Sequence, residues 1–143
     1  MQPSPKPAAD APRDFRFALA PHSGVPVYRQ LIDQVQAAIA TGALSPGDQL
    51  PTVRRVAVDL EINPNTVVRA YREMELRGVL DTQQGTGTFI AEQPQHATKD
   101  EQQRQLAQLV TEFVARAGSV GLRIDDLVQA LRQMSLEAQS KRR

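Results

Sequence analysis

The sequence predicts a mainly α-helical protein that contains a helix–turn–helix, a β-hairpin and a further pair of helices. Three observations lead to this fold class. Apolar residues recur at helical spacing in two short segments between positions 52 and 77. A turn with two glycines separates two β-prone runs between positions 79 and 90. Two longer amphipathic segments follow between positions 98 and 138.

The first predicted helix covers residues 26–40 and ends at Gly42. Tyr28 lies beside its apolar stripe, so we expect the ring in the core and the hydroxyl at the edge. Residues 45–48 predict a turn, and residues 49–50 predict a short strand that joins the hairpin as a third strand. The stripe itself repeats every four positions: Val27, Leu31, Val35 and Ile39.

Residues 52–60 and 64–77 predict two helices that pack through one face each. Thr52 is a suitable N-cap for the first, Asn63 followed by proline begins the second, and Gly78 ends it. The apolar stripes are Val53, Val56, Ala57 and Leu60 in the first helix, and Val67, Ala70, Tyr71 and Met74 in the second. At about 100° per residue, the face opposite the second stripe carries Asn65, Arg69 and Arg72.

This outward face has the chemistry that a DNA major groove requires. In a helix–turn–helix, the second helix enters the groove with its N-terminal residues at the base edges. Asn can make two contacts with adenine, and Arg can do the same with guanine. The helix N-terminus also favours phosphate. The periodicity alone is equally compatible with an ordinary two-helix corner whose outer face is only solvated.

The segment after Gly78 favours the DNA-binding interpretation, because a hairpin that follows a helix–turn–helix is a wing. Residues 79–83 and 88–90 predict the two strands, and residues 84–87 predict the turn between them. The same glycines could belong to a phosphate-binding loop. That alternative is weak, because no helix follows the glycines and no Lys-Ser/Thr pair accompanies them.

Four motifs occur in order between residues 25 and 91: Pro26-Val27-Tyr28-Arg29-Gln30-Leu31, Leu50-Pro51-Thr52-x-Arg54, Asn63-Pro64-Asn65-Thr66-Val67 and Gln84-Gly85-Thr86-Gly87-Thr88-Phe89. Together they resemble the winged-helix domain of the GntR family of bacterial transcription regulators. The Asn-Pro-Asn-Thr-Val form is similar to that of the YtrA-type branch. The resemblance implies a sequence-specific regulator that binds double-stranded DNA, and it suggests a repressor of transporter operons.

The candidate DNA-binding residues are Thr52, Arg54, Arg55, Asn63, Asn65, Thr66, Arg69, Arg72, Gly85, Thr86 and Gly87. Arg54 matches the family position that contacts DNA. Arg55 stands where the family commonly has Glu, so a capping box is lost, at a cost of a few tenths to about 1 kcal/mol. Pro64 and Val68 stand where many members carry Arg. The base contacts that carry over are therefore limited to Asn65, Thr66 and Arg69.

Residues 98–138 predict two helices. Thr98 and Glu101 form a capping box ahead of a first helix that should end at Gly118, and the last helix covers about residues 124–138. The two stripes hold more apolar surface than two helices can bury against each other, so we expect a homodimer. YtrA-type relatives use a short two-helix part in this way. The candidate dimerisation residues are Leu106, Leu109, Val110, Phe113, Val114, Leu127, Val128 and Leu131. The alternative is that the helices pack back on the winged helix.

Composition excludes several function classes. The chain has 143 residues, no Cys, two His in separate predicted loops and a net charge of +1. We therefore expect no disulfide, no metal site, no cofactor and no enzyme activity. No apolar run approaches about 18 residues, so we expect a cytoplasmic protein without a membrane span. Between residues 26 and 91, six Arg accompany seven Asp and Glu, so a DNA-binding surface requires these cations to gather on one face.

The predicted organisation has four parts: a Pro-rich disordered arm (1–14), a winged-helix DNA-binding domain (15–91), a linker (92–97) and a two-helix dimerisation segment (98–143). Residues 15–19 alternate as a short strand or an anchored extended segment would. The predicted function is that of a repressor that binds a two-fold operator as a homodimer. The alternative is a winged helix that binds an acidic protein partner. Two short helices form no deep effector pocket, and whether an effector binds stays open.

Overall fold

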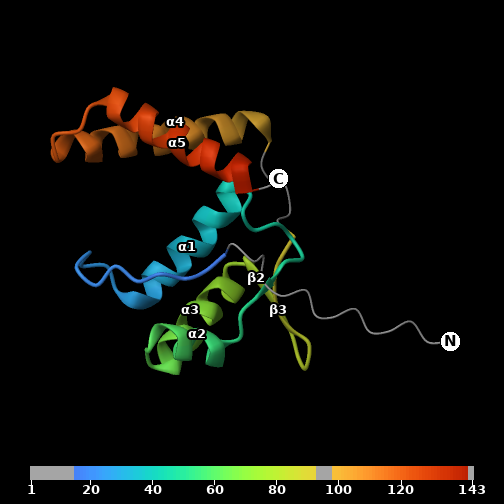
Figure 1. Cartoon of the computed structure of the whole chain (residues 1–143). Coiled ribbons are helices and arrows are strands. Elements are labelled where there is room, and N and C mark those ends of the chain that lie inside the picture. Colours follow the sequence, from blue (N-terminus) through green and yellow to red (C-terminus); the bar gives the residue numbers. More distant parts are fainter. Residues whose placement is uncertain (1–14, 93–97, 142–143) are drawn as a thin grey trace. The chain divides into compact units, whose positions relative to one another are not determined.

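The computed structural model describes residues 15–92 and 98–141 (Figure 1). The elements in this part of the chain are α1 (Val27–Thr41), β1 (Gln49–Leu50), α2 (Val53–Leu60), α3 (Pro64–Leu76), β2 (Leu80–Gln83), β3 (Gly87–Ile90), α4 (Lys99–Ser119) and α5 (Ile124–Lys141). They make a mainly helical fold with a small sheet, as predicted. The predicted arm and most of the predicted linker lie outside the described residues. Contacts within the chain divide it into two units, Met1–Gln93 and Pro94–Arg143.

The strands of the first unit form an antiparallel sheet in the order β1-β3-β2. β2 and β3 pair from Leu80 opposite Ile90 to Gln83 opposite Gly87. The amide of Thr86 closes the turn by donating to the Gln83 carbonyl at 3.0 Å. The β2–β3 hairpin projects away from the three helices (Figure 1). Both the predicted wing and its predicted third strand are therefore confirmed.

The core of this unit lies between α1, α2, α3 and the buried ends of the strands. The stripes of α2 and α3 are buried or half-buried as predicted. On α1, the buried face also includes Ile32 and Ala38, whereas Val27 and Ile39 are only half-buried. The core residues are Leu31, Ile32, Val35, Ala38, Leu44, Leu50, Val56, Ala57, Val67, Ala70, Tyr71, Met74, Val79, Leu80 and Ile90.

The turn between α2 and α3 is held by side-chain caps. Thr52 Oγ1 accepts a hydrogen bond from the Arg55 amide at 3.2 Å, and Asn63 Oδ1 accepts one from the Asn65 amide at 2.8 Å. These bonds confirm both predicted N-caps. Between the helices, Glu61 has φ +55° and ψ +46°, in the left-handed region. Within the described residues, Glu61 is the sole non-glycine at positive φ.

α3 ends in a Schellman motif, which confirms the predicted stop at Gly78. Gly78 has φ +78°, and its amide donates to the Glu75 carbonyl at 3.0 Å. The amide of Val79 donates to the Met74 carbonyl at 2.9 Å. Because β2 begins at Leu80, the hairpin follows α3 with almost no intervening loop.

The segment before α1 is extended and anchored on that helix. Gln34 Nε2 donates to the Ala18 carbonyl at 2.6 Å, and the Ala18 amide donates to Gln34 Oε1 at 2.9 Å. Gln30 forms the same pair of bonds with Ala20, at 3.2 and 2.8 Å. Two phenylalanines of the segment pack edge to face, with ring centroids 5.0 Å apart. Of the two predicted possibilities, the anchored extended segment is therefore correct.

The second unit is a hairpin of α4 and α5. The predicted capping box is present: the Glu101 amide donates to Thr98 Oγ1, and the Thr98 amide donates to Glu101 Oε2, each at 3.2 Å. α5 continues to Lys141, beyond the predicted end at Ala138. None of the helices in the described ranges is long and apolar enough to cross a lipid bilayer.

The predicted end of α4 at Gly118 is wrong. The helix continues through Gly118 to Ser119, and Gly121 takes the left-handed conformation, with φ +84°. The amide of Leu122 donates to the Ala117 carbonyl at 2.9 Å. The chain therefore closes the helix end with the second of two nearby glycines, and Gly118 keeps a helical backbone.

Candidate nucleic-acid interface

α3 presents a polar face to solvent from a rigid base. Val67 and Met74 are 0 % exposed, whereas Asn65, Arg69 and Arg72 are exposed. The two sets lie on opposite sides because the helix has 3.6 residues per turn. α3 packs against both α1 and α2, so its outer face has a fixed position in the first unit.

The arginines of this region fall into two groups. Arg77 pairs with Glu73 on the same helix at 2.8 Å, and Arg55 approaches Asp59 at 3.8 Å. Within the described chain, Arg54, Arg69 and Arg72 have neither an ion pair nor a hydrogen-bond acceptor for their guanidinium groups. The Arg55–Asp59 pair is exposed and therefore weak, but Asp59 competes for the cation that we predicted at the DNA surface.

Arg69 is nevertheless held in place, because its guanidinium carbon lies 3.9 Å from the centroid of the Tyr28 ring. This is the geometry of a cation–π interaction. Tyr28 belongs to the first turn of α1 and packs against the core, half-buried. Its place at the edge of the core agrees with the prediction, but the stack with Arg69 was not predicted. The two residues are 41 positions apart, so no local pattern could have indicated the contact.

Two of the predicted site residues have structural roles, and a third is half-buried. The side-chain oxygens of Thr52 and Asn63 are occupied as helix caps. Thr66 is half-buried, whereas the neighbouring Asn65 is exposed. These caps occupy the amides of Arg55 and Asn65. Thr52 and Asn63 therefore shape the helix starts through these bonds, in addition to any contact with DNA.

The predicted wing residues lie at the turn of the β2–β3 hairpin. Gly85 has φ +78° and Gly87 has φ +141°, conformations that residues with a Cβ rarely adopt. Gly85 and Thr86 are exposed, and Gly87 is half-buried. At the base of the hairpin, the hydroxyl of Thr82 donates to Glu75 Oε1 at 2.5 Å, which ties β2 to the last turn of α3.

The side chain of Gln49 contacts the wing turn, a role that the sequence analysis did not predict. Its Nε2 donates to the Thr86 carbonyl at 3.3 Å. A Cβ on Gly87 would lie 2.3 Å from the same Nε2, so only glycine leaves room for this amide. Gln49 and Thr86 are separated by 37 positions, although the predicted pairing of residues 49–50 with the wing placed them in the same sheet.

A buried tyrosine fixes α3 against the start of α2. The hydroxyl of Tyr71 donates to the Pro51 carbonyl at 2.6 Å, and Tyr71 is 3 % exposed. Burial raises the pKa of the Tyr71 phenol, so the hydroxyl remains a donor at neutral pH. The bond sets the start of α2, where Arg54 lies, relative to α3.

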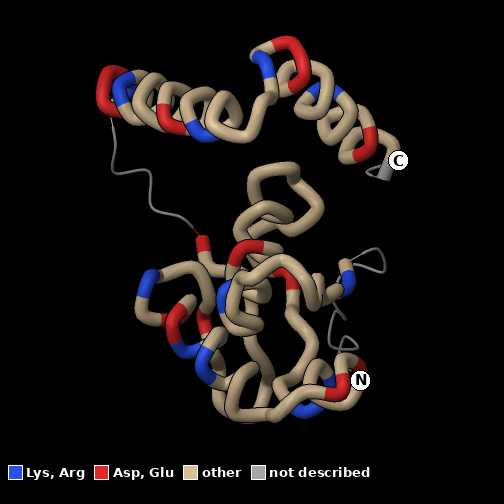
Figure 2. The backbone as a smooth tube through the Cα atoms, turned by 90° about the vertical axis from the view of Figure 1, so that its left-hand side faces the viewer, with Lys and Arg blue, Asp and Glu red and all other residues tan. Residues whose placement is uncertain are grey.

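The charges of the first unit are mixed rather than uniformly basic. Figure 2 shows basic and acidic positions interspersed along the backbone. Two of the arginines lie beside acidic residues, because Asp59 and Glu73 each pair with one. The first turn of α3 contains no acidic residue. The N-terminal part of α3 is thus free of acidic side chains, but the cations of the unit do not gather on one face as expected.

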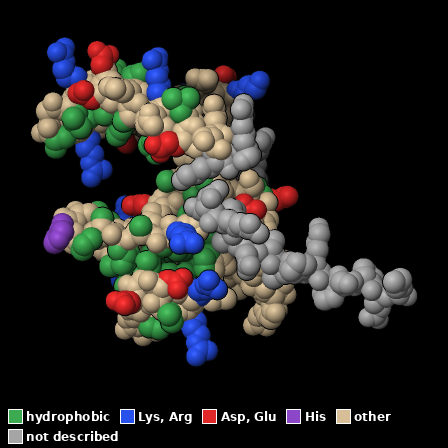
Figure 3. Space-filling model, viewed as in Figure 1, with side chains coloured by type: hydrophobic (Ala, Val, Ile, Leu, Met, Phe, Trp, Pro, Cys, Tyr) green, Lys and Arg blue, Asp and Glu red, His purple; other side chains and the backbone are tan. Residues whose placement is uncertain are grey.

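Six of the eight predicted dimerisation residues are exposed in the single chain. Hydrophobic side chains lie at the surface of the two-helix unit (Figure 3). Among the described residues of this unit, Ala117 and Leu127 are the buried apolar residues, and Val114 is half-buried. Leu127 therefore packs inside the hairpin. The other predicted residues are exposed: Leu106, Leu109, Val110, Phe113, Val128 and Leu131.

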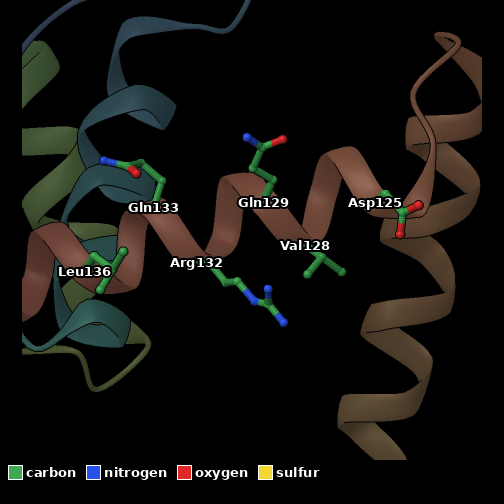
Figure 4. Close-up of a pocket in the computed structure, with 6 residues that line it drawn as sticks. All are labelled: Asp125, Val128, Gln129, Arg132, Gln133 and Leu136. Carbon is green, nitrogen blue, oxygen red and sulfur yellow. The ribbon is translucent and has the colours of Figure 1, made fainter.

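A shallow hollow follows one side of α5. Its lining residues all come from this helix: Asp125, Val128, Gln129, Arg132, Gln133 and Leu136. Val128, Arg132 and Leu136 leave one side of the helix, and Gln129 and Gln133 leave another (Figure 4). A surface formed by one helix does not enclose a ligand. Among the described residues, no three His, Cys, Asp or Glu side chains gather as metal ligands would.

The first unit is similar to a family of known proteins. Residues 27–90 match the family model described as "Bacterial regulatory proteins, gntR family". The chain is 31 % identical over 117 residues to the HTH-type transcriptional repressor YtrA of Bacillus subtilis (strain 168), covering 82 % of this chain and 90 % of that protein. It is 38 % identical over 111 residues to the uncharacterised regulator YhcF of the same strain, covering 77 % and 90 %.

A solved structure extends the similarity to the helices of the second unit. The crystal structure of a protein named a transcriptional antiterminator from Listeria monocytogenes EGD-e superimposes with a TM-score of 0.65 at 26 % identity. The superposition covers 87 % of this chain and 92 % of that one. The chain thus belongs to the GntR family of bacterial regulatory proteins, and it is a YtrA-type DNA-binding transcription regulator with a winged helix–turn–helix.

Proposed function

We propose that the chain is a repressor that binds a two-fold operator as a homodimer, with α3 in the major groove of each half-site. The proposal rests mainly on the outer face of α3, where Asn65, Arg69 and Arg72 stand exposed opposite buried Val67 and Met74. The two guanidinium groups have no acceptor among the described residues. Amide and guanidinium groups so placed can bond adenine and guanine.

A second group of residues is assigned to the phosphate backbone. Arg54 lies in the first turn of α2, where the exposed amides of a helix start also favour anions. The exposed wing turn brings Gly85, which has no side-chain bulk, and the Thr86 side chain to the surface. Such contacts position a protein on DNA without reading the sequence. Arg55 is a weaker candidate because Asp59 shares its charge.

The second unit is assigned to dimerisation. Six of the predicted residues form exposed apolar stripes on α4 and α5, and removal of such surface from water favours association. A second copy of the chain is the partner that a two-fold operator requires. Leu127 is excluded from the proposed contact surface because it is 7 % exposed in the single chain.

Repression is proposed as the direction of control because a similar protein, YtrA of Bacillus subtilis, is named a transcriptional repressor. The relatives reported above are named as regulators or as an antiterminator, and none is named as an enzyme. We therefore propose no catalytic role.

Selection of duplexes from a random library, followed by sequencing, tests DNA recognition. We expect a two-fold symmetric site, and steep loss of affinity as salt rises. Asn65→Ala and Arg69→Ala should each cost roughly 1–3 kcal/mol and relax the preference at one position of each half-site. Arg77→Ala is the matched control, because Arg77 is an exposed arginine that Glu73 already binds. Equal affinity for selected and shuffled duplexes would instead favour the protein-binding alternative.

Sedimentation tests the dimer. Phe113→Glu places a charge in the exposed stripe of α4 and should convert the dimer to a monomer that binds a whole operator more weakly, because the second half-site loses its high effective concentration. Val58→Glu is the control for sedimentation alone, because Val58 is also an exposed apolar residue but belongs to α2, on the helix of Arg54. A wild-type chain that sediments as a monomer at working concentration contradicts this part of the proposal.

A further inference from the structure

The stack between Arg69 and Tyr28 joins the outer face of α3 to the start of α1. The guanidinium carbon lies 3.9 Å from the ring centroid, close enough for direct contact between the two planar groups. Tyr28 is itself supported, because it packs half-buried against the core of the first unit. Arg69 is exposed. A fixed aromatic ring therefore restrains a long and otherwise mobile side chain.

The stack leaves the hydrogen-bonding capacity of Arg69 intact. An aromatic ring contacts the face of a guanidinium, whereas the five N–H donors lie in its plane and point outward. No acceptor for these donors exists among the described residues. Arg77 at the end of the same helix shows the contrasting case, since Glu73 accepts from its Nη2 at 2.8 Å. Arg69 is thus restrained and still available.

We infer that Tyr28 is a positioning residue that holds the Arg69 guanidinium ready to read a guanine. This inference rests on the proposed function of α3. Bidentate recognition of guanine requires a planar donor group in one orientation. An unrestrained arginine loses much rotamer freedom when it forms such contacts, and the stack removes part of that loss before DNA arrives. α1 thereby contributes to base specificity without touching a base.

A double-mutant cycle on DNA binding tests the inference, using the duplex that the full-length wild-type chain selects from a random library. Tyr28→Leu removes the π-system but keeps an apolar side chain, and Tyr28→Phe keeps the ring. Tyr28→Leu should weaken binding to the selected duplex about two- to five-fold, the range expected for an exposed cation–π contact. It should leave affinity for random duplexes unchanged. Tyr28→Phe should bind as the wild type does.

The effect of Tyr28→Leu on DNA affinity is then compared between chains with and without Arg69. In an Arg69→Ala chain, Tyr28→Leu should have no further effect on the selected duplex, because the group that Tyr28 positions is absent. In an Arg72→Ala chain, which keeps Arg69, Tyr28→Leu should retain its full effect. Equal losses in all three backgrounds, or no loss in any, overturn the inference. An equal loss from Tyr28→Phe also overturns it, because the hydroxyl would then act directly, as in a phosphate contact.

Thermal unfolding without DNA separates this inference from the proposed function. Tyr71 is the other tyrosine of the chain, so its fluorescence reports the folding of the first unit in every Tyr28 variant. If the two side chains stack, the losses of stability from Tyr28→Leu and Arg69→Ala should not add in the double mutant. The proposed function, and with it the role of Tyr28, is refuted if these stability changes are non-additive but the wild-type chain prefers no duplex sequence. Sequence-selective binding without coupling between positions 28 and 69 refutes this inference alone.

Discussion

Glu61 occupies the one strained backbone position that the helix–turn–helix contains among the described residues, and replacing it with glycine should stabilise the first unit. Its φ of +55° and ψ of +46° lie in the left-handed region. This conformation costs a residue with a Cβ roughly 1–2 kcal/mol, whereas glycine adopts it freely but loses roughly 0.5–1 kcal/mol more backbone entropy on folding. The centres of the two ranges differ by about 0.75 kcal/mol, so we expect a gain of about 0.5–1 kcal/mol for Glu61→Gly.

Thermal unfolding followed by tyrosine fluorescence measures this gain. Both tyrosines lie in the first unit and the chain has no Trp, so the signal reports that unit. The predicted gain corresponds to a rise in Tm of about 2–8 °C. Glu61→Gln is the matched control, because it removes the same charge but keeps the Cβ, and its Tm should stay at the wild-type value. If Glu61→Gly melts no higher than Glu61→Gln, backbone strain at this turn does not limit stability.

Three further predictions follow from the contacts around α3 and the wing. Tyr71→Phe should lower the free energy of unfolding, measured in urea, by about 1 kcal/mol, because the hydrogen bond to Pro51 is lost. The folded-state pKa of Tyr71 is raised, so the wild-type chain should lose stability above about pH 10, and Tyr71→Phe should reduce that loss. Gly87→Ala should displace the side-chain amide of Gln49, whereas a Cβ at Gly85 would have no atom within 4 Å. Gly87→Ala should therefore weaken DNA binding more than Gly85→Ala does. Equal losses of affinity would contradict this role of Gln49. Arg54→Ala should weaken binding to specific and random DNA alike, and it should lower the slope of log affinity against log salt concentration by about one. If the variant instead loses its preference at a single base pair, Arg54 contacts a base.

Most of the local structure could be predicted because it depends on residues within one or two helical turns of each other. The stripe of Val67, Ala70, Tyr71 and Met74 has the period of a helix, and that face is buried. The caps at Thr52, Asn63 and Thr98 needed only the identity of a residue and its distance from the first turn. The presence of a third strand followed from the run before α2, whereas its pairing with β3 came from the structure.

The helix end at Gly118 could not be predicted in the same way. Gly118 and Gly121 are both able to adopt positive φ, and either could end α4. In the structure, the chain turns at Gly121 and α5 packs back with Leu127 buried. A local pattern therefore placed the helix correctly but left its last turn undetermined.

The sequence by itself determined the class of fold, the exposed face of α3 and the apolar stripes of α4 and α5, because periodicity and capping act between near neighbours. Only the tertiary structure decided which arginine is restrained by an aromatic ring and which side chain supports the wing turn, whereas the Arg55–Asp59 and Arg77–Glu73 pairs each join residues four positions apart on one helix. Arg69 meets Tyr28 across 41 positions, and Gln49 meets Thr86 across 37. Such contacts depend on how whole elements pack, and packing is set by the core as a unit. The candidate residues of the site were therefore readable from the chain, while the groups that hold them in place became visible only in the folded structure.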